Sequence, residues 1–147
     1  MLRNVGFMSA IFVAANVVLT ASAYADDQDV IDYRQHIMKT MGEQAAAVGM
    51  IVEHRIPPDN FAVHAQILAV TAASAKKAFE PKVLGGEAKP EVWAKWADFS
   101  KRLDVLVTNT AELSKVAKDG GFAAAEAKLS TALTCKGCHE VYRVPKK

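Results

Sequence analysis

Mostly apolar residues after Pro90 recur at alternating spacings of three and four, which is the period of one face of an α-helix. The stripe consists of Trp96, Phe99, Leu103, Leu106, Thr110, Leu113 and Ala117. Pro90 suits the first turn of such a helix, because an N–H there would have no intrahelical partner. The sequence Asp119-Gly120-Gly121 follows the stripe and ends the helix. A helix with one apolar face must pack that face against other elements.

Three other stretches have the same period. A seam of residues seven apart predicts a helix over residues 29–52. After a break at Pro57-Pro58, with Asp59 or Asn60 as the N-cap, a second helix ends before Pro81. The last stretch continues into the C-terminal motif. The positions that carry these periods are Ile31, Met38, Met41, Ala45, Val48 and Val52; Phe61, Ile67, Leu68, Thr71, Ala72, Ala75 and Phe79; and Phe122, Ala125, Leu129, Ala132 and Leu133.

These stretches show no convincing β-strand alternation between them. Four amphipathic helices with mostly short connections predict an all-α fold, an antiparallel up-down four-helix bundle. The longest connection, roughly residues 80–89, joins the second helix to the third. Without the N-terminal segment described below, about 120 residues remain, which is enough for one domain with a core and too few for two.

The only two cysteines of the chain lie in Cys135-Lys136-Gly137-Cys138-His139, the C-x-x-C-H pattern of covalent c-type haem attachment. A spacing of three puts both thiols on one side of a helical turn, where they can add to the two haem vinyl groups. His139 can then donate a ring nitrogen as the proximal axial ligand of the iron. A redox dithiol, half of a zinc site or a disulfide would also use C-x-x-C, but none explains the adjoining histidine. We therefore predict one covalently bound haem c per chain, near the C-terminal helix.

The N-terminus has the pattern of a secretory signal peptide. Arg3 precedes an uncharged stretch over residues 5–20, and small residues at Ala23 and Ala25 precede acidic residues. We predict a signal peptide over residues 1–25, cleaved after Ala25 or Ala23, and a mature domain over residues 26–147. An uncleaved anchor is the alternative, although the apolar run is short for a membrane span. The predicted destination is a bacterial periplasm, with no stable membrane anchor after cleavage.

The charge is close to balanced, with 18 Lys and Arg against 16 Asp and Glu. A nucleic-acid-binding domain would carry a clear basic excess, so we expect no nucleic-acid partner. Transfer of single electrons at a haem requires no catalytic acid, base or nucleophile, and we expect a protein that is not an enzyme.

The C-terminal segment from Cys135 to Arg143 resembles that of the class II cytochromes c, the cytochrome c prime family, which places its haem motif in the last helix with an aromatic and a basic residue just after it. Tyr33-Arg34-Gln35, Phe79-Glu80-Pro81 and Lys89-Pro90-Glu91-Val92-Trp93 also look like family segments. The resemblance covers essentially the whole mature chain. It implies a four-helix bundle that carries haem c.

The family divides by its distal residue, which the resemblance places at Met38. In high-spin members an apolar side chain crowds an open iron face that binds nitric oxide or carbon monoxide, whereas in low-spin members a methionine binds the iron. The string from Met38 to Gly42 looks more like the low-spin group. A flexible thioether on the inward seam is also a soft ligand within reach of iron, although core packing is the ordinary role of such a residue. We predict Met38 as the distal axial ligand, with Met41 as the fallback.

Two arginines flank the predicted ligands. Arg34 precedes Met38 by one helical turn and shares its face, so the resemblance implies a contact with a haem propionate, with Gln35 at the haem edge. A solvated surface arginine is the alternative. Arg143 follows His139 by one turn, where its charge would weaken the imidazolate character of the proximal ligand. Arg143 could instead stabilise the helix C-terminus.

These expectations give three functions. The first is a periplasmic electron carrier that transfers single electrons, with His139 and Met38 as axial ligands and transient redox partner proteins. The alternative is a five-coordinate, high-spin protein that binds nitric oxide or carbon monoxide, with Met38 as a steric gate. The third is a four-helix module without haem that has a disulfide between Cys135 and Cys138. A homodimer is common in the family that the sequence resembles.

Overall fold

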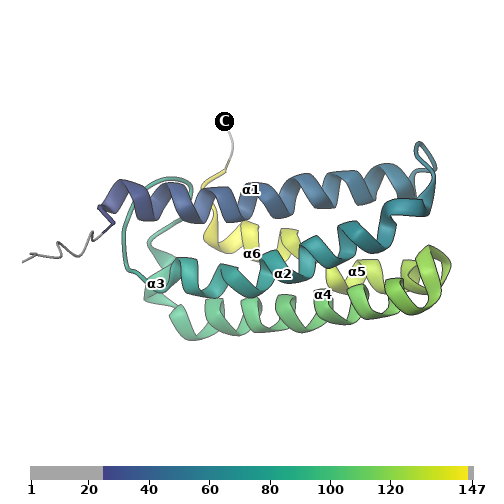
Figure 1. The fold of residues 1–147 in the computed structure, drawn as a ribbon. Coiled ribbons are helices and arrows are strands. Elements are labelled where there is room, and N and C mark those ends of the chain that lie inside the picture. Colours follow the sequence, from purple (N-terminus) through teal and green to yellow (C-terminus); the bar gives the residue numbers. More distant parts are fainter. Residues whose placement is uncertain (1–24, 146–147) are drawn as a thin grey trace, which may run out of the picture.

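The computed structural model describes residues 25–145, so the predicted signal peptide lies outside the described residues except for Ala25. The elements are α1 (Asp27–Val52), η1 (Pro58–Asn60), α2 (Phe61–Phe79), α3 (Glu91–Ala94), α4 (Trp96–Ala125), η2 (Glu126–Lys128), α5 (Leu129–Ala132) and α6 (Cys135–Tyr142). Figure 1 shows α1, α2 and α4 lying lengthwise beside one another, with α5 and α6 forming the fourth side. The predicted four-helix bundle is confirmed, and the described part of the chain contains isolated bridges but no strand.

The first helix begins where its side chains can satisfy its free N–H groups. The Asp26 carboxylate accepts a hydrogen bond from the Asp29 N–H at 2.8 Å, and the Asp29 carboxylate accepts one from the Asp26 N–H at 3.3 Å. This reciprocal capping box starts α1 two residues before the predicted helix. The residues buried along α1 are Ile31, Arg34, Val48 and Ile51.

The predicted third and fourth helices are interrupted. Lys95, at φ −121° and ψ 42°, is not helical, so the long helix begins at Trp96 and only the short α3 follows Pro90. Gly121, at φ 71°, bends the chain as Asp119-Gly120-Gly121 predicted, although helical hydrogen bonding resumes up to Ala125. Leu133, at φ −105° and ψ 58°, separates α5 from α6. The haem motif therefore lies on a short helix of its own.

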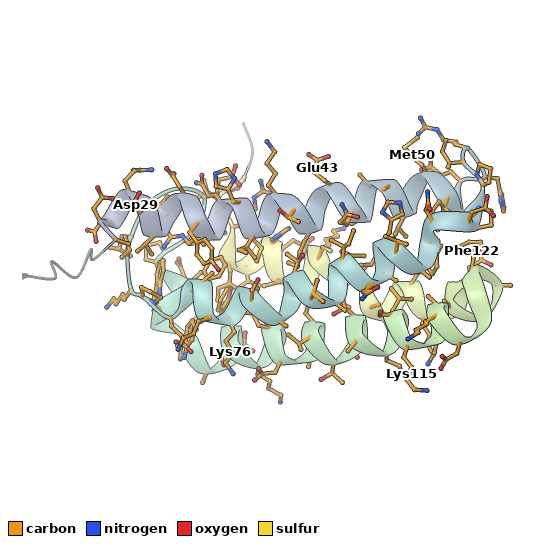
Figure 2. All side chains as sticks on the ribbon, viewed as in Figure 1. Asp29, Glu43, Met50, Lys76, Lys115 and Phe122 are labelled. Atoms are coloured by element: carbon orange, nitrogen blue, oxygen red, sulfur yellow. The ribbon has the colours of Figure 1, made fainter. Side chains whose placement is uncertain are left out.

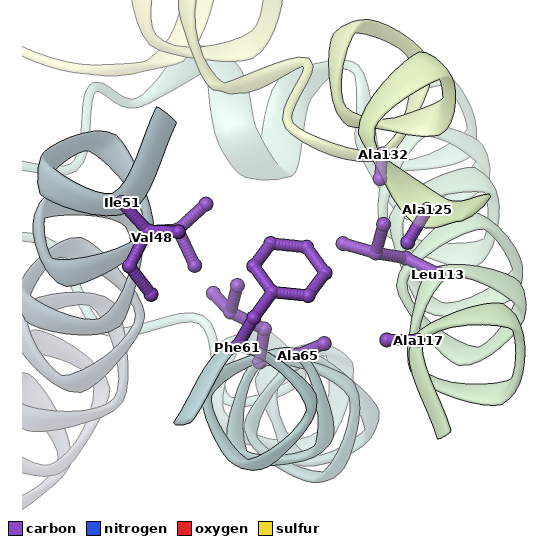
Figure 3. Packing of buried hydrophobic residues seen from close by; sticks show 9 residues of the cluster. Val48, Ile51, Phe61, Ala65, Leu113, Ala117, Ala125 and Ala132 are labelled. Carbon is purple, nitrogen blue, oxygen red and sulfur yellow. The ribbon is translucent and has the colours of Figure 1, made fainter. Parts of the chain in front are cut away.

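The core is divided along the bundle. One cluster lies around Phe61, whose ring meets the Phe122 ring edge-on at 5.0 Å between centroids, and Figure 3 shows the ring between side chains of the surrounding helices. Its buried members are Val48, Ile51, Phe61, Ala65, Leu68, Leu113, Ala117, Ala125 and Ala132. A second cluster, which we call the motif-side cluster, contains buried Ala75, Ala78, Phe79, Val92, Phe99, Leu103 and Tyr142. The motif-side cluster is the one that reaches the C-x-x-C-H segment.

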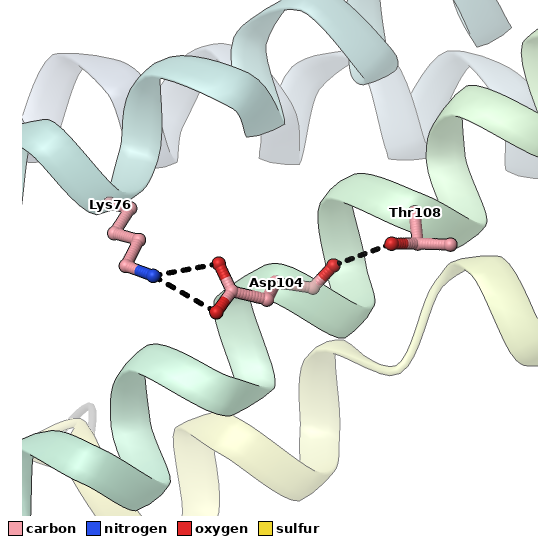
Figure 4. A network of polar contacts seen from close by, with 3 residues as sticks. All are labelled: Lys76, Asp104 and Thr108. Carbon is pink, nitrogen blue, oxygen red and sulfur yellow. Dashed lines mark hydrogen bonds and ion pairs between the residues drawn. The ribbon is translucent and has the colours of Figure 1, made fainter.

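Charged residues cover the outer faces of the helices, where Glu43 and Lys115 are exposed (Figure 2). Lys76 on α2 lies 2.9 Å from both carboxylate oxygens of Asp104 on α4, and the Asp104 carbonyl accepts a hydrogen bond from the Thr108 hydroxyl (Figure 4). Such a partly exposed ion pair stabilises a fold by at most about 1 kcal/mol. Within residues 25–145 no helix is long and apolar enough to cross a membrane.

Candidate haem site

Both thiols of the motif are free and lie on the first turn of α6. Cys135 is exposed, whereas Cys138 is half-buried and packs against the motif-side cluster. Burial raises the pKa of the Cys138 thiol, and the nearby Arg102 charge opposes this rise in the pKa. One thiol therefore faces solvent and the other faces the apolar side of the bundle, one helical turn apart.

His139 is exposed beside these thiols. Partial desolvation lowers the pKa of His139, the charge of Arg143 lowers it further, and the charge of Glu87 acts in the opposite direction. The neutral ring is the form that binds a metal. Two free thiols and a neutral imidazole at this spacing fit a covalently bound haem c, with Cys135 and Cys138 as its anchors and His139 as an iron ligand.

The helix that carries the motif is fixed to α4 by polar contacts. The Tyr142 hydroxyl donates to the Asp98 carboxylate at 2.5 Å, and Arg102 donates from Nε to the same carboxylate at 2.7 Å. Arg102 also donates to the backbone carbonyl of Gly137, inside the motif, at 3.0 Å. The Tyr142 hydrogen bond, followed by that of Arg102, lowers the pKa of Asp98. Tyr142 and Arg102 were not among the predicted site residues, and the i,i+4 relation of Arg102 to Asp98 was the available signal.

The predicted distal residue lies on the same cluster as the motif. Met38 is half-buried on α1 and packs against the motif-side cluster, as Cys138 does from α6. Met41, the fallback, packs instead against the cluster around Phe61. The fold thus brings one methionine to the haem-binding side of the bundle and directs the other away from it.

Arg34 is only 2% exposed, so the alternative of a solvated surface arginine is wrong. Its terminal nitrogens donate to the carbonyls of Val83 at 2.6 Å and Gly85 at 2.7 Å. The guanidinium also lies over the Trp93 ring, 5.1 Å from its centroid. Gln35 is exposed on the same helix. The predicted contacts of Arg34 and Gln35 with the haem stay predictions, and the structure adds a separate role for Arg34 in holding the loop before α3.

Residues 83–89, which we call the strap, lie between α2 and α3 in the sequence. They contact α1 on one side and the chain that leaves α6 on the other. At one end Arg34 holds the strap through its two hydrogen bonds. At the other, the Val144 N–H donates to the Glu87 carbonyl at 2.8 Å, and the Lys89 N–H donates to the Tyr142 carbonyl at 2.9 Å. Arg143 is paired with Glu87, its Nε lying 2.7 Å from Glu87 Oε2. The strap therefore joins the helix of Met38 to the arginine that follows His139.

Replacing Gly86 by alanine should destabilise the strap. Gly86 has φ +60°, and an added Cβ would lie 2.4 Å from Gln35 Nε2 and 3.0 Å from Ile31 Cγ2. We expect the free energy of unfolding of the holoprotein in urea to fall by about 1–2 kcal/mol.

Gly42→Ala is the matched control, because it lies inside α1 with nothing within 4 Å of its added Cβ. It should raise stability by up to about 1 kcal/mol. Equal effects of the two replacements would contradict the assigned role of Gly86.

Comparison with known proteins points to a single family. The family model described as Cytochrome C' matches residues 29–143. Cytochrome c' from Pararhodospirillum photometricum is 34% identical over 125 residues, which cover 81% of this chain and 99% of that one. A solved structure of cytochrome c prime from Alcaligenes xylosoxidans, a ferrous variant with bound NO, has a TM-score of 0.76 at 27% identity, covering 84% of this chain and 99% of that one. A carbon monoxide-bound variant from the same organism has a TM-score of 0.75 at 27% identity, covering 83% and 99%.

These relatives overturn one prediction. The leading expectation was an electron carrier of the low-spin group, with Met38 on the iron. Three of the curated relatives are cytochromes c', and solved structures of one of these proteins hold nitric oxide or carbon monoxide. A methionine on the iron would fill the coordination position that an exogenous gas requires. The prediction of an electron carrier with His139 and Met38 as axial ligands is therefore wrong. The physical reason for the wrong prediction is that an inward methionine serves equally well as a packing residue.

Proposed function

The chain belongs to the cytochrome c' family, whose members carry covalently attached haem c, and we propose from this that it is a periplasmic, five-coordinate haem protein that binds nitric oxide or carbon monoxide. The observation that carries the proposal is the similarity to cytochromes c' whose solved structures hold nitric oxide or carbon monoxide. Met38 is half-buried against the cluster that Cys138 also borders, which supports a role for its side chain beside the haem. When bound, the haem supplies an iron with one open coordination position for the gas.

The side chains have separate roles in this proposal. Cys135 and Cys138 would hold the haem through thioether bonds, and His139 would be an iron ligand. Met38 would act as a steric gate for the gas, and Arg34 and Gln35 would contact the haem edge. The hydrogen bonds of Tyr142 to Asp98 and of Arg102 to the Gly137 carbonyl keep the motif helix against α4, which supports a fixed orientation of the imidazole.

Two further parts of the proposal concern the cell. The N-terminal pattern of residues 1–25 supports export, and we propose that the signal is removed before the haem protein functions. A transient redox partner that returns the iron to the ferrous state completes the proposal.

Absorption spectra of the ferric and ferrous holoprotein, with and without carbon monoxide, test this function. We expect the wild-type ferrous protein to have a high-spin spectrum that shifts when carbon monoxide is added. A low-spin ferrous spectrum that changes with gas only in the Met38→Ala variant would overturn the proposal, because it would place Met38 on the iron.

Met38→Ala should accelerate carbon monoxide binding to the ferrous haem by about tenfold or more relative to the wild type, since a tenfold rate change corresponds to about 1.4 kcal/mol of barrier. The expected cause is removal of side-chain volume from the distal side. Stopped-flow mixing measures the association rate. Met41→Ala makes the same chemical change beside the Phe61 cluster and should leave the rate near that of the wild type. Equal association rates for both variants would show that Met38 is not the steric gate.

A further inference from the structure

An ion pair lies next to the proposed proximal ligand, and the proposed function does not use it. Arg143 Nε donates to Glu87 Oε2 at 2.7 Å, and a second guanidinium nitrogen contacts the same oxygen. The Arg143 side chain is 31% exposed and that of Glu87 52% exposed. Two contacts from one guanidinium to a carboxylate orient both groups more firmly than a single contact between flexible chains.

The backbone holds the two residues opposite each other. Ala88 and Arg143 form an isolated antiparallel bridge, and the Val144 N–H donates to the Glu87 carbonyl at 2.8 Å. Arg34 fixes the preceding part of the strap through the carbonyls of Val83 and Gly85. None of these hydrogen bonds uses the Glu87 carboxylate. A change of that carboxylate therefore alters charge while the backbone position of the pair is retained.

Arg143 lies one helical turn from His139, and Glu87 is held against Arg143. The backbone N–H of Arg143 donates to the His139 carbonyl at 3.0 Å. A positive charge near a haem favours the ferrous iron, because the ferric form carries one more positive charge. A carboxylate that neutralises this arginine therefore favours the ferric iron.

We propose that Glu87 is a positioning residue and counter-charge for Arg143, and that it thereby lowers the midpoint potential of the haem iron. The inference rests on the proposed function, because it concerns how much of the iron is ferrous and able to take a gas. The carboxylate does not touch the iron in this proposal. It acts by holding and neutralising the guanidinium beside His139.

The test is the midpoint potential of the gas-free holoprotein, measured by spectroelectrochemical titration. Glu87→Gln should shift the potential upward, because the charge of Arg143 is left uncompensated. Arg143→Gln should shift the potential downward, because the Glu87 charge is left alone. The double variant should return close to the wild-type potential, since both charges are gone. Glu87→Asp keeps the charge and should remain closer to the wild type than Glu87→Gln does.

Glu91→Gln is the matched control. This replacement removes the same charge at the start of α3. Within residues 25–145 the Glu91 carboxylate joins no ion pair. The inference is overturned if Glu87→Gln shifts the potential no more than Glu91→Gln, or if the double variant stays far from the wild type. Circular dichroism of each variant establishes that the bundle is retained.

This experiment also separates the inference from the proposed function. The potential is measured without gas and requires only attached haem. If the expected shifts are found in a protein that binds neither gas, the gas-binding function fails and the role of Glu87 stands. If the protein binds gas and the shifts are absent, the role of Glu87 fails and the function stands.

Discussion

Replacing Cys135 and Cys138 together by serine is expected to abolish covalent haem attachment. The two thiols are the only cysteines of the chain, and they lie free on one turn of α6 beside His139. A serine hydroxyl does not form the thioether that holds haem c, so no covalent link to the cofactor remains. The measurement is haem staining of a denaturing gel, using protein made in cells that carry out c-type maturation.

Two further variants sharpen this result. Cys135→Ser alone leaves Cys138 for a single thioether and should reduce the stained fraction rather than remove it. Gly137→Ala alters the same motif, but nothing lies within 4 Å of its added Cβ, and it should retain full staining. A stained band from the double serine variant would mean that the haem is attached elsewhere.

The second large effect is expected at Arg34. Arg34→Met should lower the free energy of unfolding by about 3 kcal/mol, because two carbonyls lose charged hydrogen-bond donors and the Trp93 ring loses a stacked cation. Burial lowers the pKa of the Arg34 guanidinium from its usual range, which shows that desolvation works against the charge and that the hydrogen bonds must compensate. Urea unfolding of the holoprotein measures the loss.

Arg55→Met provides the exposed counterpart. The Arg55 side chain is 61% exposed and pairs with Glu53, so its replacement should change stability by less than about 0.5 kcal/mol. Arg34→Lys should recover only part of the loss, because one ammonium cannot reproduce the two-pronged contact of a guanidinium. A loss at Arg34 as small as that at Arg55 would contradict its role as the anchor of the strap.

The bundle could be predicted because burial imposes a repeating pattern on each long helix. The stripe from Phe99 to Ala117 is buried at every expected position except Leu106, which is half-buried, and the C-x-x-C-H motif lies at the predicted place on the fourth side. The breaks at Lys95 and Leu133 could not be predicted, because neither residue is a glycine or proline and the local backbone follows from tertiary packing.

The environment of the site was harder to infer than its ligands. Arg34 was placed on the correct face, but its acceptors are backbone carbonyls, which leave no mark in the sequence. Glu87 was missed because its partner Arg143 lies 56 positions away and no local spacing relates them. Met38 was assigned to the iron because a methionine that packs in the core and a methionine that binds iron have the same side chain, so the sequence does not distinguish the two roles.

The strap makes the connection after α2 and the turn after α1 unequal as places for insertion or for grafting a tag. Connections usually tolerate changes of length, because they lie at the surface and fix few contacts. Residues 83–89 are fixed at both ends, by Arg34 and by residues 142–144, so an added residue would move Glu87 out of register with Arg143. Residues 53–57, between α1 and η1, are all exposed. Engineered additions to this bundle belong in that turn, at the end remote from the haem motif.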